Sequence, residues 1–364
     1  MSDVWGNSIK VSIFGESHGN AIGITLDELP AGYQIDMDKI EKEMKRRAPG
    51  RSAISTPRKE SDIPEIVSGI FNGKTTGNTL CGIIRNTDTR SKDYSQLKDL
   101  MRPGHSDYTG SIRYKGFNDY RGGGHFSGRL TAPLVFAGAV CKQILDKKGV
   151  YIGAHIKSIK DVSDDSFDYV NITKEQLLSF SEQEIPLIDT SKEELIRNTI
   201  IQAKKNEDSV GGVIECAVIG LNPGLGSPFF DSVESVLSHI LFSVPAIKGV
   251  EFGLGFDITK LYGSESNDAF YYDGDNVKTK TNNNGGILGG ITSGMPLVFK
   301  TAVKPTASIG IEQDTVNIST KKNDKLVIQG RHDPCIAQRA VPVIEAVTAI
   351  AILGLMKERY GCNL

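Results

Sequence analysis

Apolar residues recur along the chain with two spacings, one typical of strands and one typical of helices. The runs at 11–14 (VSIF) and 21–27 (AIGITLD) are short and rich in β-branched residues, and FGESHGN separates them, so we predict a hairpin with this glycine-bounded loop. Further strand-like runs are VYIGAHIKSI (150–159), GGVIECAVIG (211–220) and MPLVFKTAV (295–303).

Helical patterns lie between these runs. In DMDKIEKEMKRRAPG (36–50), Ile40 and Met44 share one face, Asp36 or Asp38 is a cap, and the Pro-Gly pair ends the pattern. TAPLVFAGAVCKQILDKKG (131–149) is apolar almost all round, which predicts a buried helix with Thr131 as its cap.

Two more helices are predicted in the second half of the chain. Thr190 and Glu193 have the spacing of a capping box before ELIRNTIIQAKK (194–205). The segment 341–359 begins near a proline and is largely apolar, but its length and Glu345 favour a core helix over a membrane span.

The order of these elements shows no regular βαβ alternation, no internal repeat and no linker rich in serine or proline. We therefore predict one α+β domain over residues 1–364, with helices packed on sheets; a division into two domains is the alternative.

Composition narrows the function classes. The 364 residues carry a formal charge of -2 with a pI near 6.3, which argues against a nucleic-acid-binding protein. No signal-like segment or run of eighteen apolar residues occurs, so we expect a cytoplasmic protein. The five cysteines form no CxxC pair and the histidines have no HxH or HExxH spacing, so we expect no metal site.

Arginines gather in glycine- and proline-interrupted segments. Arg46, Arg47, Arg51 and Arg58 fall within 45–60, a segment that cannot be one regular helical face. Guanidinium groups pair with phosphate and carboxylate oxygens, so a small polyanionic ligand is one interpretation and an exposed basic loop is the other. Arginines in similar contexts are Arg102, Arg121, Arg129, Arg331 and Arg339.

Glycine clusters suggest close approach of backbone to a ligand. GGGHFSG (122–128) precedes the buried helix at 131, where backbone N–H groups favour an anion, although a glycine-rich turn without a ligand is the commoner case for such a segment alone. The cluster is neither GxGxxG nor a P-loop. GGILGGITSG (285–294) permits either a flat ligand or tight strand packing.

The histidines offer proton transfer near neutral pH. His105 lies two residues before Asp107, and His332 is followed by Asp333, so a carboxylate is near to fix a tautomer or act as a base. Ser17 and His18 are adjacent and would project to opposite sides of an extended segment, which argues against a Ser-His-Asp triad.

Taken together, the motifs resemble those of the chorismate synthase family in order and spacing. The resemblance covers most of the chain and rests on FGESHG, RRAPG…STPR, NTDTRSKDY, RPGHSDYT, RGGGHFSGR, GGILGGITSG, KPTASI and GRHDPC…RAVPVIEA. It implies a β-α-β sandwich of antiparallel sheets with helices between them, assembled as a homotetramer. It also implies a lyase of aromatic amino-acid biosynthesis that converts 5-enolpyruvylshikimate 3-phosphate to chorismate by trans-1,4-elimination of phosphate. The implied cofactor is reduced FMN, with NADPH as one source of its electrons and an outside reductase as the other.

The resemblance also implies roles for individual residues. His18 assists the departing phosphate, His105 lies against the flavin, and Asp333 takes part in removing the ring proton. The implied substrate-binding residues are Ser17, Arg47, Arg58, Arg102, Arg129, Arg331 and Arg339. The implied flavin contacts are His125, Phe126, Ser127, Ala246, Gly289, Lys304, Pro305, Thr306, Ala307, Ser308 and Arg331. This chain reads HFSGRLT where many members read RSSARET, so the resemblance does not fix its contacts to the FMN phosphate.

Two other interpretations stay open at this point. A non-catalytic anion- or RNA-binding protein would use the basic segment 45–60 but leaves the histidines unexplained. A different flavin enzyme acting on an anionic substrate would oxidise or reduce that substrate.

Overall fold

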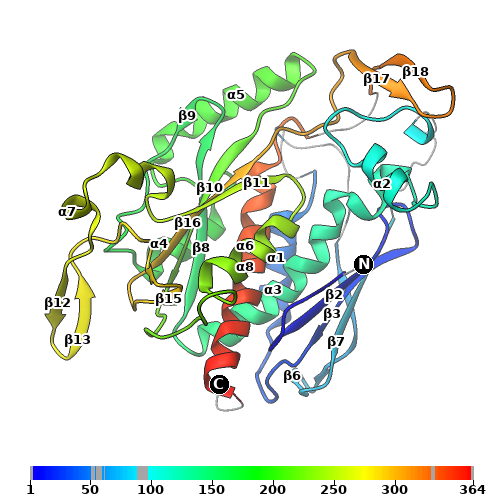
Figure 1. Ribbon diagram of the computed structural model, residues 1–364. Coiled ribbons are helices and arrows are strands. Elements are labelled where there is room, and N and C mark those ends of the chain that lie inside the picture. The colour runs from blue at the N-terminus through cyan, green and yellow to red at the C-terminus, as the bar shows by residue number, and fades with distance from the viewer. Residues whose placement is uncertain are drawn as a thin grey trace.

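Two five-stranded antiparallel sheets face each other with long helices between them (Figure 1). This computed structural model describes residues 3–50, 54, 60, 62–87, 97–328 and 333–361. The strand order of the first sheet is β1 (Val4–Trp5), β2 (Lys10–Gly15), β3 (Ala21–Asp27), β7 (Leu80–Arg85) and β4 (Pro64–Ser68). That of the second is β11 (Ile247–Phe252), β16 (Leu297–Val303), β10 (Gly212–Ile219), β8 (Tyr151–Ile159) and β9 (Val162–Ser163). The structure confirms the α+β class and the sandwich.

The predicted hairpin is formed by β2 and β3, which pair antiparallel from Lys10↔Asp27 to Gly15↔Ile22. In β3, Ile22, Ile24 and Leu26 are buried, as the period of two along a strand requires for a sheet with one face on the core. The loop that joins the two strands is the segment 16–20, so the hairpin displays Ser17 and His18 at one end of the sheet.

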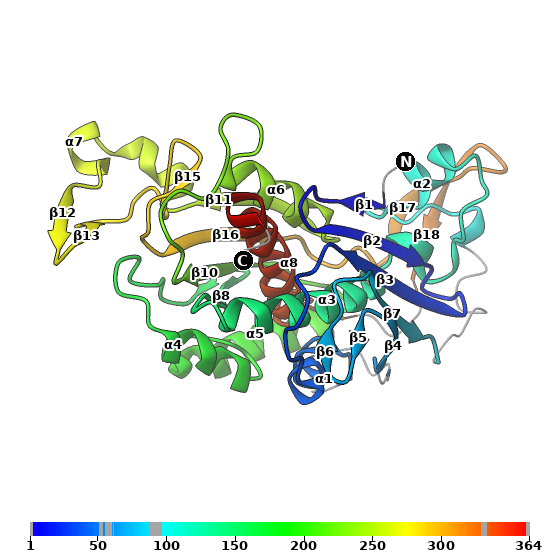
Figure 2. The same cartoon turned by 90° about the horizontal axis from the view of Figure 1, so that it is seen from below.

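The two central helices are α3 (Thr131–Asp146) and α8 (Ala337–Tyr360). They pack so closely that a side chain at Gly138 of α3 would overlap Ala346 of α8, its Cβ lying 2.3 Å from the alanine Cβ. Figure 2 shows both helices between the sheets. α8 is long and apolar enough to cross a membrane, but 83% of its most apolar window is buried inside the protein, as expected of a core helix.

An ion network joins α1 (Met37–Arg47) to both central helices. Glu345 of α8 accepts hydrogen bonds from Arg46 at 2.6 and 2.9 Å and from Lys142 of α3 at 2.8 Å. Burial raises the pKa of Glu345, but these two cations outweigh burial and lower it to about 2. The carboxylate also accepts the backbone N–H of Ala154, so it ties three helices to β8.

Three helix starts differ from the sequence predictions. Thr131 is the first residue of α3 rather than its cap; its hydroxyl donates to the Gly128 carbonyl at 2.6 Å and accepts from Arg47 Nε. The predicted capping box is not formed, because the Asp189 side chain caps a 3-10 turn that precedes α5 (Glu193–Lys205). α8 begins at Ala337, before the predicted start at 341.

The remaining elements surround this sandwich. They are β5 (Ile70–Phe71), β6 (Lys74–Thr75), α2 (Asp107–Arg113), α4 (Lys174–Ser179), α6 (Val233–Ser243), α7 (Gly263–Ser266), β12 (Phe270–Asp273), β13 (Asn276–Thr279), β14 (Ile287–Leu288), β15 (Ile291–Thr292), β17 (Gln313–Asn317) and β18 (Lys322–Leu326). Short 3-10 helices cover Arg121–Phe126 and Gly128–Leu130, directly before α3.

Candidate active site

The β2–β3 loop and the glycine run 122–124 bring two histidines together. Ser17 is fully buried and His18 is 7% exposed, and the Ser17 N–H donates to the carbonyl of Gly124 at 3.1 Å. A Cβ on Gly122 would lie 2.2 Å from His18 Cε1 and Nδ1. A Cβ on Gly123 would lie 3.1 and 3.2 Å from His105 Cε1 and Nε2. Consecutive glycines therefore let the backbone lie directly against both imidazoles.

The glycine run adopts a conformation that other residues resist. Gly122, Gly123 and Gly124 have φ of 59°, 82° and 54°, in the left-handed region that favours glycine. The N–H of Gly123 donates to the carbonyl of Tyr120 at 3.2 Å, so this amide is engaged within the protein. The glycines thus allow the backbone to lie close to the two histidines. That their N–H groups bind an anion stays a prediction.

His105 is held by Asp107, the first residue of α2. Asp107 Oδ1 lies 2.7 Å from His105 Nδ1, and the same carboxylate accepts Nε and Nη2 of Arg102, both at 2.7 Å. Nδ1 of the ring thus faces Asp107 and Arg102, whose Nη2 lies 3.1 Å away, and Nε2 lies beside Gly123. Burial raises the pKa of Asp107, but the hydrogen bonds from Arg102 and His105 outweigh it and hold the pKa well below its usual range.

The segment 304–308 lies beside this group. Arg102 Nη1 donates to Ser308 Oγ at 3.2 Å, and Lys304 Nζ donates to the carbonyl of Gly104. The backbone N–H of Lys304 donates to the carbonyl of Ala246 at 2.9 Å. The structure thus brings residues 304–308 and Ala246, all predicted flavin contacts, next to the segment that carries Arg102 and His105.

A second cluster contains the buried arginines. Arg47 Nη1 donates to Asp62 Oδ2 at 2.8 Å, and Arg129 Nη1 donates to Asp62 Oδ1 at 2.6 Å. Burial lowers the pKa of Arg47 to about 10, with Asp62 opposing that shift and the neighbouring Arg339 and Arg129 adding to it. A buried guanidinium whose charge is disfavoured by burial and by two neighbouring guanidinium groups favours the binding of an anion.

Arg339 and Asp333 complete this cluster. Arg339 Nε donates to the Arg47 carbonyl at 3.0 Å, and its Nη1 is paired with the Asp333 carboxylate. The guanidinium of Arg339 therefore lies between the Asp333 carboxylate and the backbone of Arg47. Predicted residues Arg58 and Arg331 lie outside the described residues.

The remaining predicted flavin contacts differ in their surroundings. Phe126 packs on Gly110 of α2, Ser127 Oγ accepts the N–H of Arg129 at 3.3 Å, and His125 Nδ1 lies 2.9 Å from the Gly15 carbonyl. Gly289 lies in the turn between β14 and β15, and Figures 1 and 2 both place this hairpin at the opposite side of the molecule from α2. The structure therefore does not bring Gly289 to the histidines.

Two residues of the site were not identified from the sequence. Asp62, fully enclosed between two arginines, has no motif of its own, and its left-handed φ of 49° is invisible in the sequence. Asn86, which links Arg129 to the β2–β3 loop, lies in the NTDTRSKDY motif. For Asn86, its position within that motif was the only indication in the sequence of a role in the site.

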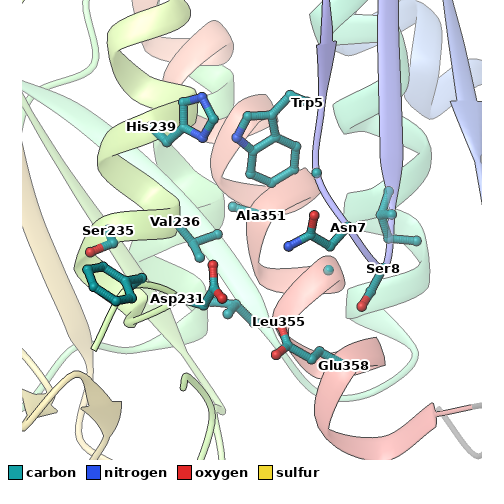
Figure 3. A pocket seen from close by; sticks show the side chains of 14 residues that line it. Trp5, Asn7, Ser8, Asp231, Ser235, Val236, His239, Ala351, Leu355 and Glu358 are labelled. Atoms are coloured by element: carbon teal, nitrogen blue, oxygen red, sulfur yellow. The ribbon is translucent and has the colours of Figure 1, made fainter. Parts of the chain in front are cut away.

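A separate hollow of ≈ 280 Å³ lies between the β1–β2 turn, α6 and α8 (Figure 3). Among the residues that the structure describes, its charged lining residues are the carboxylates Asp231 and Glu358, and no lysine or arginine lines it. An anionic substrate would be repelled there, so the hollow is not an alternative to the arginine site.

The fold and the site define an α+β protein whose buried arginines and paired histidines suit a polyanionic substrate. Comparison with known proteins is more specific, since the sequence profile of the family described as "Chorismate synthase" matches residues 9–356. This chain belongs to the chorismate synthase family.

Relatives match over nearly their whole length. The chain is 44% identical to a protein named chorismate synthase from Dehalococcoides mccartyi, covering 98% of this chain and 96% of the relative. A chorismate synthase from Methanocaldococcus jannaschii is also 44% identical, with the same coverage. A solved structure titled "Crystal Structure of Chorismate Synthase" superposes with a TM-score of 0.76 at 29% identity, covering 98% of this chain and 94% of that one.

Proposed function

We propose that this protein is a lyase that eliminates phosphate from 5-enolpyruvylshikimate 3-phosphate to form chorismate, in aromatic amino-acid biosynthesis. The observation that carries the proposal is the contact of His18 and His105 with the adjacent glycines Gly122 and Gly123. Asn86 connects the His18 loop to the arginine cluster, so a proton donor and an anion site lie on one connected framework.

Binding and orientation of the substrate fall to the arginine cluster. The substrate carries one phosphate and two carboxylates, and the guanidinium groups of Arg47, Arg129 and Arg339 offer planar pairs of N–H donors for such oxygens. In this structure their positive charge is balanced by Asp62, Asp333 and Glu60. The substrate therefore competes with internal carboxylates for these donors.

Two neighbouring side chains assist departure of the phosphate. His18 donates a proton or a strong hydrogen bond to the leaving oxygen, which lowers the charge that develops there. Among the described residues, Ser17 Oγ is buried without a hydrogen-bond partner, and we assign it to a phosphate oxygen. Asp333, held in place by Arg339, takes part in removing the ring proton.

The site also fits a flavin. The segment 304–308 and Ala246, which are predicted flavin contacts, lie beside Arg102 and His105. FMN would be held by Lys304 to Ser308, Ala246, His125, Phe126 and Ser127. Arg102 lies beside this group and is hydrogen-bonded to Ser308. When bound there, reduced FMN would supply electron density for the departure of the phosphate, with no net change in its own oxidation state.

We extend the proposal to the organisation of the protein. The large core cluster includes residues of both sheets and of α3 and α8, which supports one domain over 1–364. Membership of the family supports a cytoplasmic homotetramer. NADPH serves as reductant if the enzyme reduces its own flavin.

The test is to bind FMN to the purified protein and supply the enolpyruvyl substrate under strict anaerobiosis. We expect chorismate with pre-reduced FMN and none with oxidised FMN. Absence of product with reduced FMN contradicts the proposal. A flavin enzyme of another type would instead leave an oxidised or reduced substrate.

A further inference from the structure

We propose that Asn86 is a positioning residue that fastens the loop of Ser17 and His18 to Arg129; the inference rests on the function proposed for this site. Asn86 follows β7 directly. Its Nδ2 donates to the carbonyls of Glu16 at 3.0 Å and Gly19 at 2.8 Å. Its Oδ1 accepts from Arg129 Nε at 2.6 Å.

The chemistry of these partners requires an amide at position 86. A guanidinium can only donate and a backbone carbonyl can only accept, so the side chain must present one acceptor to Arg129 and two donors to the loop. An aspartate would keep the acceptor but place a negative oxygen against two carbonyls. This requirement also fixes which atom of the amide is oxygen.

The two carbonyls held by Asn86 bracket Ser17 and His18 in the chain. The loop is closed by the Gly19 N–H, which donates to the Glu16 carbonyl at 3.0 Å, and the Asn86 N–H adds a bond to the Asn20 carbonyl at 3.2 Å. Arg129 is fixed on its other side by Asp62. One amide therefore sets the position of the proton donor relative to an arginine of the anion site.

The test compares Asn86→Asp with Asn78→Asp, a control at an exposed position two residues before the same strand. Loss of the two loop bonds should lower kcat about 100-fold, since a displacement of about 1 Å costs that much. KM should change less, because the acceptor for Arg129 remains. In a His18→Ala background the further loss should be under about threefold, since both changes act through His18. A full additional loss in that background would overturn the proposal.

A second measurement does not depend on activity. In proteins with labelled histidine, the His18 Cε1–H NMR signal, assigned with His18→Ala, should shift in Asn86→Asp and stay in place in Asn78→Asp. Arg129→Lys, which lacks Nε, should shift it too and serves if Asn86→Asp does not fold. An unmoved His18 signal in a folded variant overturns the proposal. If the wild type makes no chorismate but the signal shifts, the proposed function fails and the positioning role stands.

Discussion

Gly122→Ala tests whether the glycine run sets the place of His18. The new Cβ would lie 2.2 Å from two atoms of the imidazole, whereas ordinary contact begins at 3.4 Å. The ring or the glycine run must therefore yield by about 1.2 Å, the difference between those distances. If the ring yields, a shift of that size costs about 100-fold in turnover, equivalent to about 2.7 kcal/mol in the barrier.

Backbone strain adds a separate effect on stability. Alanine at the left-handed φ of 59° costs about 1–2 kcal/mol of folding free energy. Gly116→Ala is the control for backbone strain without a clash, because Gly116 has a φ of 77° and nothing within 4 Å of its Cβ position. Gly128→Ala is the control in which neither the clash nor the backbone strain occurs, since its Cβ position is open and its φ is not left-handed.

The assay is chorismate formation with pre-reduced FMN, combined with urea unfolding of each variant. We expect Gly116→Ala to lose stability with normal kcat, Gly128→Ala to match the wild type, and Gly122→Ala alone to lose kcat. A folded Gly122→Ala enzyme with wild-type kcat would refute the claim that close backbone approach positions His18.

Three further predictions follow from the site and the core. His18→Ala should lower turnover strongly while thermal unfolding stays near that of the wild type; near-normal turnover would remove its proposed role. Glu345→Gln should lower the free energy of unfolding by about 3 kcal/mol, the low end for a broken buried ion pair, because Arg46 and Lys142 lose one carboxylate and keep only Glu43; denaturant unfolding measures it. The pKa of Asp107 is lowered by folding, so its contribution is present above the ordinary pKa of 3.8 and is lost as the pH falls below it. Asp107→Asn should therefore lose less stability than the wild type between about pH 5 and pH 3 in urea unfolding; equal losses would contradict the assignment.

Local patterns in the sequence predicted the elements because each depends on near neighbours. The spacing of apolar residues within each segment predicted the β2–β3 hairpin, α1 with its Asp36 cap and the two core helices. The helix starts were less predictable because tertiary contacts override local signals. Thr131 is drawn into a bond with Arg47, which is far away in sequence, and so does not cap α3.

The site was predictable only through the resemblance and in part. The family motifs identified the histidines and the arginines as candidates, and the spacing of His105 and Asp107 predicted that they pair. The sequence could not show that Asp62 lies between Arg47 and Arg129, or that Asn86 spans two segments, because both depend on the meeting of distant loops.

The most direct test of the proposed reaction is the stoichiometry of a single anaerobic turnover experiment. Inorganic phosphate, chorismate and the flavin spectrum are measured together on pre-reduced enzyme with 5-enolpyruvylshikimate 3-phosphate. The account predicts one phosphate for each chorismate and a flavin that ends in the reduced state in which it began. Phosphate without chorismate, or product formed only with net oxidation of the flavin, would contradict it.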